Sequence, residues 1–385
     1  MVGWLDGWVA EGVEMLSVQW SMRESERGRR GAWGQSFTPA PLSPCPSTQK
    51  APLPRPERWV RLPATLLILL LLLALPFMVS AFQLTLATEV LILALFATSF
   101  NLLFGHTGLL SFGHAAYFSI GAYTSAIVLM RVRPSMPLAL AGGMALATLA
   151  ALVFGVFCVR LDRLYFAMLT LAFGQMVYGL IFDLHRVIGI SRVLAGIPRP
   201  TIHLMRLSLE IEPIVGYYYL TAGLVVISLF LLWAVVRSPF GFTLRTIRVN
   251  PERVEFIGIP VRRYRLAAFV ISGAFSGLAG ALYAPFLRAV TPGMAFWPRS
   301  IDPVLMSLLG GMHTFMGPAV GAVIFITIKG ALSSLIAERW MFYLGTLLIA
   351  LVIFVPGGVV SFVQQRLVPN SRGDERNWLV GTEGT

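Results

Sequence analysis

The feature that most constrains the fold of this chain is a long stretch almost free of charge. Between Arg61 and Arg131 the only formally charged side chain is Glu89. A helix needs about 20 apolar residues to cross roughly 30 Å of hydrocarbon, so this stretch has room for several crossings. Strands of a membrane barrel would alternate polar and apolar residues, and this stretch does not. The sequence therefore predicts an all-α, polytopic bundle of transmembrane helices.

The composition agrees with a membrane protein and excludes two other classes. Of the 385 residues, 56% are hydrophobic and 12% are charged, and the charged fraction of a soluble domain is about twice as large. The net charge of +12 comes mostly from arginines in short loops and tails, which is typical of cytoplasmic loops in membrane proteins and argues against nucleic-acid binding. Cys45 and Cys158 are the only cysteines, and they provide neither a disulfide framework nor a metal site.

Nine apolar segments are long enough to be membrane spans. They cover residues 63–80, 82–104, 106–130, 137–160, 164–182, 216–236, 266–288, 303–328 and 341–362. Some are rich in glycine and can be broken or re-entrant, so we expect about eight to ten spans. The segment "SLLGGMHTFMGPAVGA" (307–322) holds four glycines and Pro318, and it is where we expect a break.

The spans form one permease-like domain, residues 63–362, between two polar tails. Residues 1–62 are basic and rich in proline, which predicts a disordered cytoplasmic tail; a misassigned translation start is the alternative origin of this segment. Residues 363–385 form a polar C-terminal tail. Counted from a cytoplasmic N-terminus, the connection 183–215 lies outside, and the connection 237–265, with seven arginines, lies inside.

The segment "FGHTGLLSFGHAAYFSIGAY" (104–123) is unusual for a span because it holds four glycines and two histidines. Such glycine content predicts an irregular or broken helix, which membranes tolerate where the segment is buried in protein or borders water. The segment also carries small residues at helical spacing, which would let helix backbones pack closely. These are Ser111, Ala115, Ser119 and Ala122.

Polar side chains in this segment, just before it and in "YFAMLTLAFGQMVYGL" (165–180) are the candidates for lining a translocation pathway. They are Asn101, His106, Thr107, Ser111, His114, Tyr117, Thr170 and Gln175. For each histidine and for Gln175, the alternative is a hydrogen bond to a neighbouring helix. The histidines lie on different helix faces with no carboxylate or thiol nearby, so we expect no metal site.

The connection "SPFGFTLRTIRVNPERVEFIGIPVRRYRL" (238–266) predicts a turn followed by a short amphipathic helix. Proline and glycine in Ser-Pro-Phe-Gly favour the turn. Asn250 and Pro251 resemble a helix start, and Gly258 can end that helix.

Two interpretations of this short helix remain open. Its apolar edge would fit a groove on a soluble partner, and that edge is formed by Val254, Ile257 and Ile259. Alternatively, the helix lies on anionic lipid headgroups, bound through Arg262, Arg263 and Arg265.

Several catalytic motifs are absent from the sequence. There is no G-x-x-x-x-G-K-[ST] phosphate loop, so this chain is not expected to hydrolyse ATP in the P-loop manner. There is also no G-x-S-x-G elbow and no H-E-x-x-H, and intramembrane carboxylates are too few for a proton relay. We therefore predict that the chain is not an enzyme.

Five segments, in order along the chain, resemble the permease subunit of branched-chain amino acid ABC importers, of the LivM type. The segments are residues 101–126, 165–178, 196–200 ("GIPRP"), 238–286 and 308–322, and the resemblance covers about residues 63–362. Two positions depart from the family pattern. Leu109 stands where a polar residue, often glutamine, is usual, and "IGISRVLAGIP" (188–198) lacks most of a glycine-rich run.

The resemblance implies a type II ABC-importer-like permease with glycine-broken helices in a prokaryotic inner membrane. The implied partners are membrane lipid, a second homologous permease, two cytoplasmic ABC ATPases and an extracytoplasmic solute-binding protein. No cofactor is expected on this chain, because ATP and Mg²⁺ would bind the ATPases. The loop that docks onto the ATPases corresponds to residues 238–265, with Pro239, Gly241, Arg245, Arg248, Glu252, Glu255 and Gly258 as its candidate residues.

The resemblance implies a branched-chain or other hydrophobic amino acid as the solute. Urea, short amides and small aromatic acids are alternatives within the same class of permease. An ion-coupled secondary transporter is an alternative of another class, for which Glu89 is the available intramembrane carboxylate. A membrane enzyme would need a polar catalytic cluster, and only His106 and His114 qualify.

Overall fold

The computed structural model describes most of the region predicted to span the membrane. The described residues are 72–132, 134–161, 163–188, 193–198, 202–204, 207–209, 214–335, 345–346 and 358–360. Both predicted tails, half of the predicted first span, 63–80, and nearly all of the last predicted span, 341–362, lie outside these residues. The predicted tail boundaries therefore stay predictions.

Six helices in the described residues are long and apolar enough to cross a membrane. They are α3 (Ala81–Asn101), which continues as the π-helix η1 (Leu102–Thr107), α4 (His114–Ile127), which continues as η2 (Val128–Val132), α5 (Met136–Cys158), α6 (Arg163–Ile188), α7 (Ile214–Arg237) and α10 (Val261–Leu287). They match six of the predicted spans. The predicted all-α, polytopic membrane fold is thereby confirmed.

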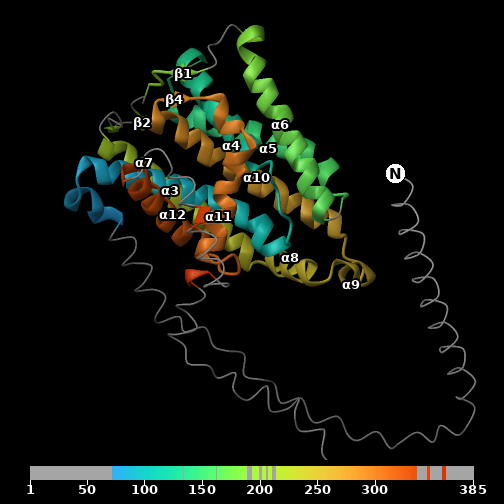
Figure 1. The fold of residues 1–385 in the computed structure, drawn as a ribbon. Coiled ribbons are helices and arrows are strands. Elements are labelled where there is room, and N and C mark those ends of the chain that lie inside the picture. The colour runs from blue at the N-terminus through green and yellow to red at the C-terminus, as the bar shows by residue number, and fades with distance from the viewer. Residues whose placement is uncertain are drawn as a thin grey trace, which may run out of the picture. The chain divides into compact units, whose positions relative to one another are not determined.

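Helix α10 packs against α3, α4 and α5, and lies among them in Figure 1. Its contact with α4 is close enough to require glycine. A Cβ atom on Gly280 would lie less than 3.0 Å from the carbonyl oxygen of Phe118, and one on Gly121 would meet the carbonyl of Gly277 in the same way. Helices in lipid associate through such packing, because the surrounding lipid is as apolar as their side chains.

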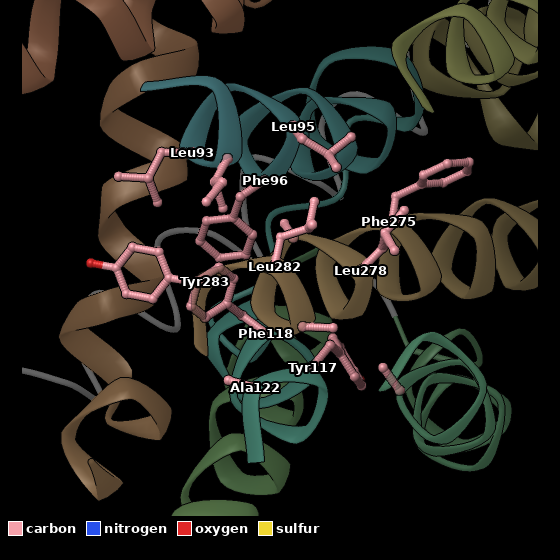
Figure 2. Close-up of a cluster of buried hydrophobic side chains, with 14 of the residues drawn as sticks. Leu93, Leu95, Phe96, Tyr117, Phe118, Ala122, Phe275, Leu278, Leu282 and Tyr283 are labelled. Atoms are coloured by element: carbon pink, nitrogen blue, oxygen red, sulfur yellow. The ribbon is translucent and has the colours of Figure 1, made fainter. Parts of the chain in front are cut away.

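A cluster of large apolar side chains fills the space where α3, α4 and α10 meet (Figure 2). The ring centroids of Phe96 and Phe118 are 4.8 Å apart, and those of Phe118 and Tyr283 are 5.3 Å apart. Leu282 is fully buried beside them. The aromatic contacts add to the packing energy that area burial alone supplies.

Three segments interrupt the helices. Residues 108–113 are not helical, so the predicted span 106–130 starts as a helix only at His114. After α10 come two short 3₁₀-helices, η3 (Pro292–Ala295) and η4 (Trp297–Ser300). The predicted break in 307–322 is confirmed, because α11 (Ile301–Gly310) and α12 (Gly317–Leu335) are separated by residues 311–316.

One prediction about these segments was wrong. Ser111 lies in the irregular segment before α4, so it does not belong to the helical stripe of small residues. The other three members, Ala115, Ser119 and Ala122, lie on α4 and are buried. The spacing alone could not show that the helix begins after Ser111.

Connections at the two ends of α7 carry different structures. Before it lie the short strands β1 (Leu194–Ala195), β2 (Ile202–Leu204) and β3 (Leu207–Leu209). β2 and β3 pair with each other, and β1 pairs with β4 (Ala289–Val290), which follows α10; both pairs are antiparallel. After it lie α8 (Pro239–Val249) and α9 (Pro251–Phe256). We call these ends of the bundle the strand end and the α8 end. The predicted placement of the two connections at opposite ends is confirmed, while the side that each faces stays a prediction.

Candidate functional site

The irregular segment 108–113 contacts the predicted pathway residue Thr170 on α6. The Thr170 hydroxyl accepts a hydrogen bond from the backbone N–H of Phe112 at 3.2 Å. Gly113 packs against the Thr170 backbone so closely that a Cβ atom would overlap its carbonyl oxygen. The structure therefore brings together the two glycine-containing segments that the sequence indicated, and non-helical backbone here is buried in protein as membranes require.

His114 begins α4 in a fully buried position. Its Nε2 lies 2.8 Å from the Ser272 hydroxyl, which donates to the Ser99 carbonyl at 2.6 Å. The imidazole also packs edge-on against Phe100 and Tyr117, with centroids 5.1 and 5.7 Å away. The structure thus shows the alternative weighed for this residue, a hydrogen bond to a neighbouring helix.

The polar residues at the end of α3 cluster near the break between α11 and α12. His106 Nδ1 lies 3.2 Å from the Asn101 carbonyl oxygen, and the Thr107 hydroxyl donates to the Leu103 carbonyl. A Cβ atom on Gly105 would overlap the carbonyl of Met312 in the break. These predicted pathway residues therefore lie at the α8 end, apart from His114.

The remaining predicted pathway residues are buried or partly buried. The Ser111 hydroxyl accepts from the Gly113 N–H at 3.4 Å, and Tyr117 is 2% exposed. The Nε2 of Gln175 is buried without a hydrogen-bond partner among the residues that the structure describes. Leu109, where the family usually has a polar residue, is 1% exposed. Their contact with a solute stays a prediction.

The loop after α7 is helical for almost its whole length. Asn250 caps α9, because its side-chain oxygen accepts from the Arg253 N–H at 3.1 Å, and Gly258, with φ +88°, follows the end of α9. The start and end predicted for this helix are confirmed. The predicted turn at Ser-Pro-Phe-Gly was wrong: only Ser238 separates the helices, and Pro239 begins α8, with Gly241 inside it.

The Arg248 side chain contacts two other segments at the α8 end: the end of η1 with the residue that follows it, and the break at residues 311–316. Its guanidinium donates to the carbonyl of Gly105, and its Nη1 lies 3.1 Å from Nδ1 of His313 in the 311–316 break. Gly108, with φ +74°, packs on its aliphatic stem. A guanidinium can only donate, so Nδ1 of His313 accepts this bond and carries no proton.

The outer surface of α8 and α9 exposes large apolar side chains. Phe256 is 90% exposed, Val249 82%, Ile257 77% and Phe242 73%. The predicted apolar edge was therefore partly wrong, since Val254 packs inside with Ile247 and Val261. An exposed apolar patch of this kind marks an interaction surface.

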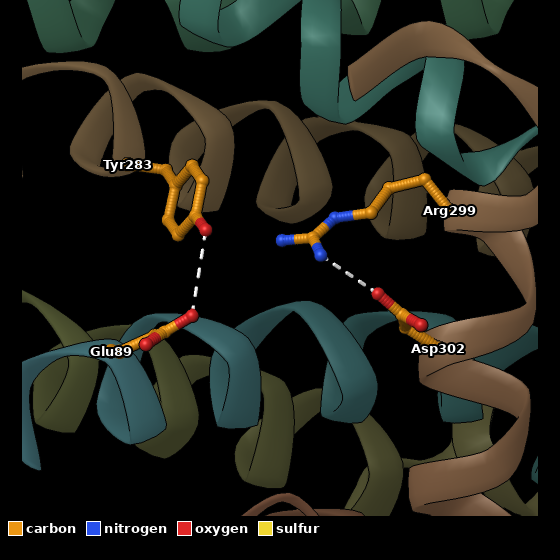
Figure 3. Close-up of polar contacts among 4 residues, drawn as sticks. All are labelled: Glu89, Tyr283, Arg299 and Asp302. Atoms are coloured by element: carbon orange, nitrogen blue, oxygen red, sulfur yellow. Dashed lines mark hydrogen bonds and ion pairs between the residues drawn. The ribbon is translucent and has the colours of Figure 1, made fainter. Parts of the chain in front are cut away.

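A second polar cluster, which we did not predict, lies near the N-termini of α4 and α11 (Figure 3). The Arg299 guanidinium donates to Asp302 at 2.9 Å, and the Tyr283 hydroxyl lies 3.5 Å from a Glu89 carboxylate oxygen. Arg299 and Asp302 were missed because they precede the apolar segment assigned to 303–328. Two opposite charges three residues apart at the start of an apolar run were the available signal.

Comparisons with known proteins support a transport role. The family model described as "Branched-chain amino acid transport system / permease component" matches residues 82–355. The chain is 28% identical to the "High-affinity branched-chain amino acid transport system permease protein LivM" of Escherichia coli (strain K12), over 78% of this chain and 75% of that protein.

Relatives with other named solutes match a smaller part. The "Guanosine ABC transporter permease protein NupP" of Bacillus subtilis (strain 168) is 33% identical over 32% of this chain and 35% of that protein. No match was found among solved structures.

Proposed function

Because the chain belongs to the permease components of branched-chain amino acid transport systems, we propose that it forms half of the membrane pore of an ATP-driven amino acid importer. It is a multi-pass inner-membrane protein. The other half of the pore would be a second, homologous permease, and an extracytoplasmic binding protein would deliver the solute. Two cytoplasmic ATPases would bind ATP and Mg²⁺. They would also bind the α8–α9 loop of this chain.

The observation that carries this proposal is the contact network of Arg248. One side chain connects the loop to the end of α3 and to the break between α11 and α12. A displacement of α8 by the ATPases would therefore act directly on the two segments whose helices are interrupted. Interrupted helices absorb motion in transporters because few backbone hydrogen bonds must be broken there.

The exposed surface of the loop supports docking of a soluble protein. Phe242, Val249 and Phe256 offer apolar anchors, and Glu252 and Glu255 are exposed on the same short helix, α9. Apolar anchors with charges around them are the usual composition of a protein interface. We assign this surface to the ATPase rather than to lipid headgroups, because Glu252 and Glu255 lie among its apolar anchors and anionic lipid repels carboxylates, whereas Arg262 and Arg263, which could bind lipid, lie at the start of α10.

We expect Arg248→Ala to lower amino acid uptake by about tenfold or more while ATP hydrolysis persists. The reason is that α8 would no longer be bonded to the Gly105 carbonyl or to His313 in the 311–316 break. The measurement is the ratio of leucine transported to ATP hydrolysed, in proteoliposomes that hold the complete transporter. Arg160, just after α5 and outside the docking loop, is exposed, so Arg160→Ala is the control and should keep the ratio. An unchanged ratio in Arg248→Ala would overturn the coupling role.

A double charge reversal on α9, Glu252→Lys with Glu255→Lys, should weaken ATPase binding by about tenfold. The new lysines would face the groups on the ATPase that complement the glutamates, and like charges across an interface oppose association. Co-purification of the ATPases with the permease measures the effect. Membrane insertion should be normal, because both side chains are exposed. Full ATPase recovery with the double variant would argue against docking at α9.

A further inference from the structure

We propose that Arg299 and Glu89 bind the carboxylate and the ammonium group of a zwitterionic α-amino acid as it passes through the permease, an inference that rests on the proposed function. Both side chains extend from different elements toward the ring of Tyr283, as Figure 3 shows. Arg299 comes from η4 and Glu89 from α3. None of the predicted pathway residues belongs to this cluster.

Arg299 uses only part of its hydrogen-bonding capacity. Its Nη1 donates to Asp302, and the guanidinium carbon lies 5.4 Å from the centroid of the Tyr283 ring, while Nε and Nη2 are buried without a hydrogen-bond acceptor among the described residues. Buried donors without acceptors cost free energy. Nε and Nη2 form one edge of the planar guanidinium, and such an edge binds both oxygens of a carboxylate in parallel. The side chain as a whole is 17% exposed, so the site is not sealed.

Glu89 is a carboxylate that needs a cation. It is the only formally charged residue in the span Ala81–Thr107. Its contact is the Tyr283 hydroxyl at 3.5 Å, and no basic residue lies within ion-pair distance of it in the part of the chain that the structure describes. Charged groups inside membranes are paired or take part in transport. An ammonium group would supply the missing positive charge.

The charges alternate when an α-amino acid is added to the cluster. Asp302 is negative and Arg299 positive, then come the carboxylate and ammonium of the solute, and Glu89 is negative. A neutral solute, such as a nucleoside or an amide, would leave both the guanidinium edge and Glu89 unpaired. A carboxylic acid without an ammonium group would bring a second negative charge toward Glu89. The arrangement therefore favours α-amino acids over the other solutes of this transporter class.

The surrounding backbone also suits a solute site. The N–H of Ala115, in the first turn of α4, donates to the Ser300 hydroxyl at 2.9 Å, which joins the N-terminus of α4 to the N-terminus of α11. Arg299 directly precedes Ser300. In transporters, the ends of interrupted helices border the solute near the middle of the membrane, and N-termini favour anionic groups there.

The test uses the complete transporter in proteoliposomes, with uptake of radiolabelled leucine and ATP hydrolysis measured together. Glu89→Gln removes the charge but keeps an oxygen that can accept from Tyr283. We expect Glu89→Gln and Arg299→Gln each to lower leucine transported per ATP by about tenfold or more. Arg299→Lys, which keeps the charge without the planar edge, should give an intermediate loss. Arg131→Gln, at an exposed arginine, is the control and should transport normally.

The outcomes separate this inference from the proposed function. If wild-type transporter moves leucine and both glutamine variants do so within about twofold, the inference is wrong and the function stands. If the wild type moves no amino acid with any binding protein, the proposed function itself fails. If Arg299→Gln does not assemble, Glu89→Gln decides alone, since it keeps the hydrogen bond and should assemble normally.

Discussion

Replacing Gly280 with valine should prevent stable assembly of the helix bundle. A Cβ atom at this position would lie inside the contact distance of the Phe118 carbonyl oxygen, which is backbone and cannot rotate away. Overpacking with movable side chains costs about 1–3 kcal/mol, so a collision with backbone at the α4–α10 crossing should lower the free energy of unfolding by more than about 3 kcal/mol. The measurement is the thermal unfolding midpoint of the detergent-solubilised permease.

A matched variant controls for the effect of valine in a membrane helix. A Cβ atom on Gly223, in α7, meets no atom within 4 Å among the described residues. Gly223→Val should therefore unfold within a few degrees of the wild type, because a surface change of this kind is worth about 0.5 kcal/mol or less. Equal unfolding midpoints for Gly280→Val and Gly223→Val would show that α4 and α10 can move apart without a loss of stability, contrary to the packing described above.

The second large effect is expected at Gly321, where α12 crosses α11. A Cβ atom there would overlap the Met306 carbonyl and would lie 2.8 Å from the backbone nitrogen of Gly310. Gly321→Val should push α12 away from α11 and open the break at residues 311–316. We expect a loss of stability of about 3 kcal/mol and leucine uptake reduced by about tenfold or more. Thermal unfolding and uptake are measured on the same preparation.

Gly223→Val, in α7, serves as the control here as well. A Cβ atom on Gly223 meets no described atom within 4 Å, so both stability and uptake should stay near the wild-type values. If Gly321→Val transports leucine at the wild-type rate, close contact between α11 and α12 is not needed for transport.

The long apolar helices could be predicted from sequence because their signal is local. Runs of about 20 apolar residues stand out against charged loops. Six predicted spans match helices to within a few residues, except at the starts of α4 and α10 and at the end of α6. The break between α11 and α12 was also predictable, because four glycines and Pro318 lie together. The cap at Asn250 follows from an equally local pattern.

Other features depend on contacts that no local pattern shows. Proline at the first position of a helix and proline in a turn look alike in sequence, so Pro239 was assigned to a turn although it begins α8. Ser111 has helical spacing but precedes the helix. Arg248 was expected to meet the ATPase, and its contacts with Gly105 and His313 join residues far apart in the chain.

The candidate site was predictable only in part, for the same reason. Sequence directed attention to the histidines, and His114 proved to be bonded to Ser272. Glu89 was noticed as a lone charge, but its nearness to Arg299 arises from the packing of α3 against residues two hundred positions later. Electrostatic partners of this kind cannot be derived from spacing.

Helix α10 connects the two faces of the membrane as one continuous rod. Its 27 residues extend over about 40 Å. The rod starts just after α9 and ends beside β4, where Arg288 accepts backbone hydrogen bonds from Gly196 and Ile197 at 2.9 and 3.2 Å. A tilt imposed at either end must move the other. Binding of one protein at one face would thus change the affinity of the opposite face for a second protein, and the reverse. This coupling would not depend on residues that line the translocation pathway.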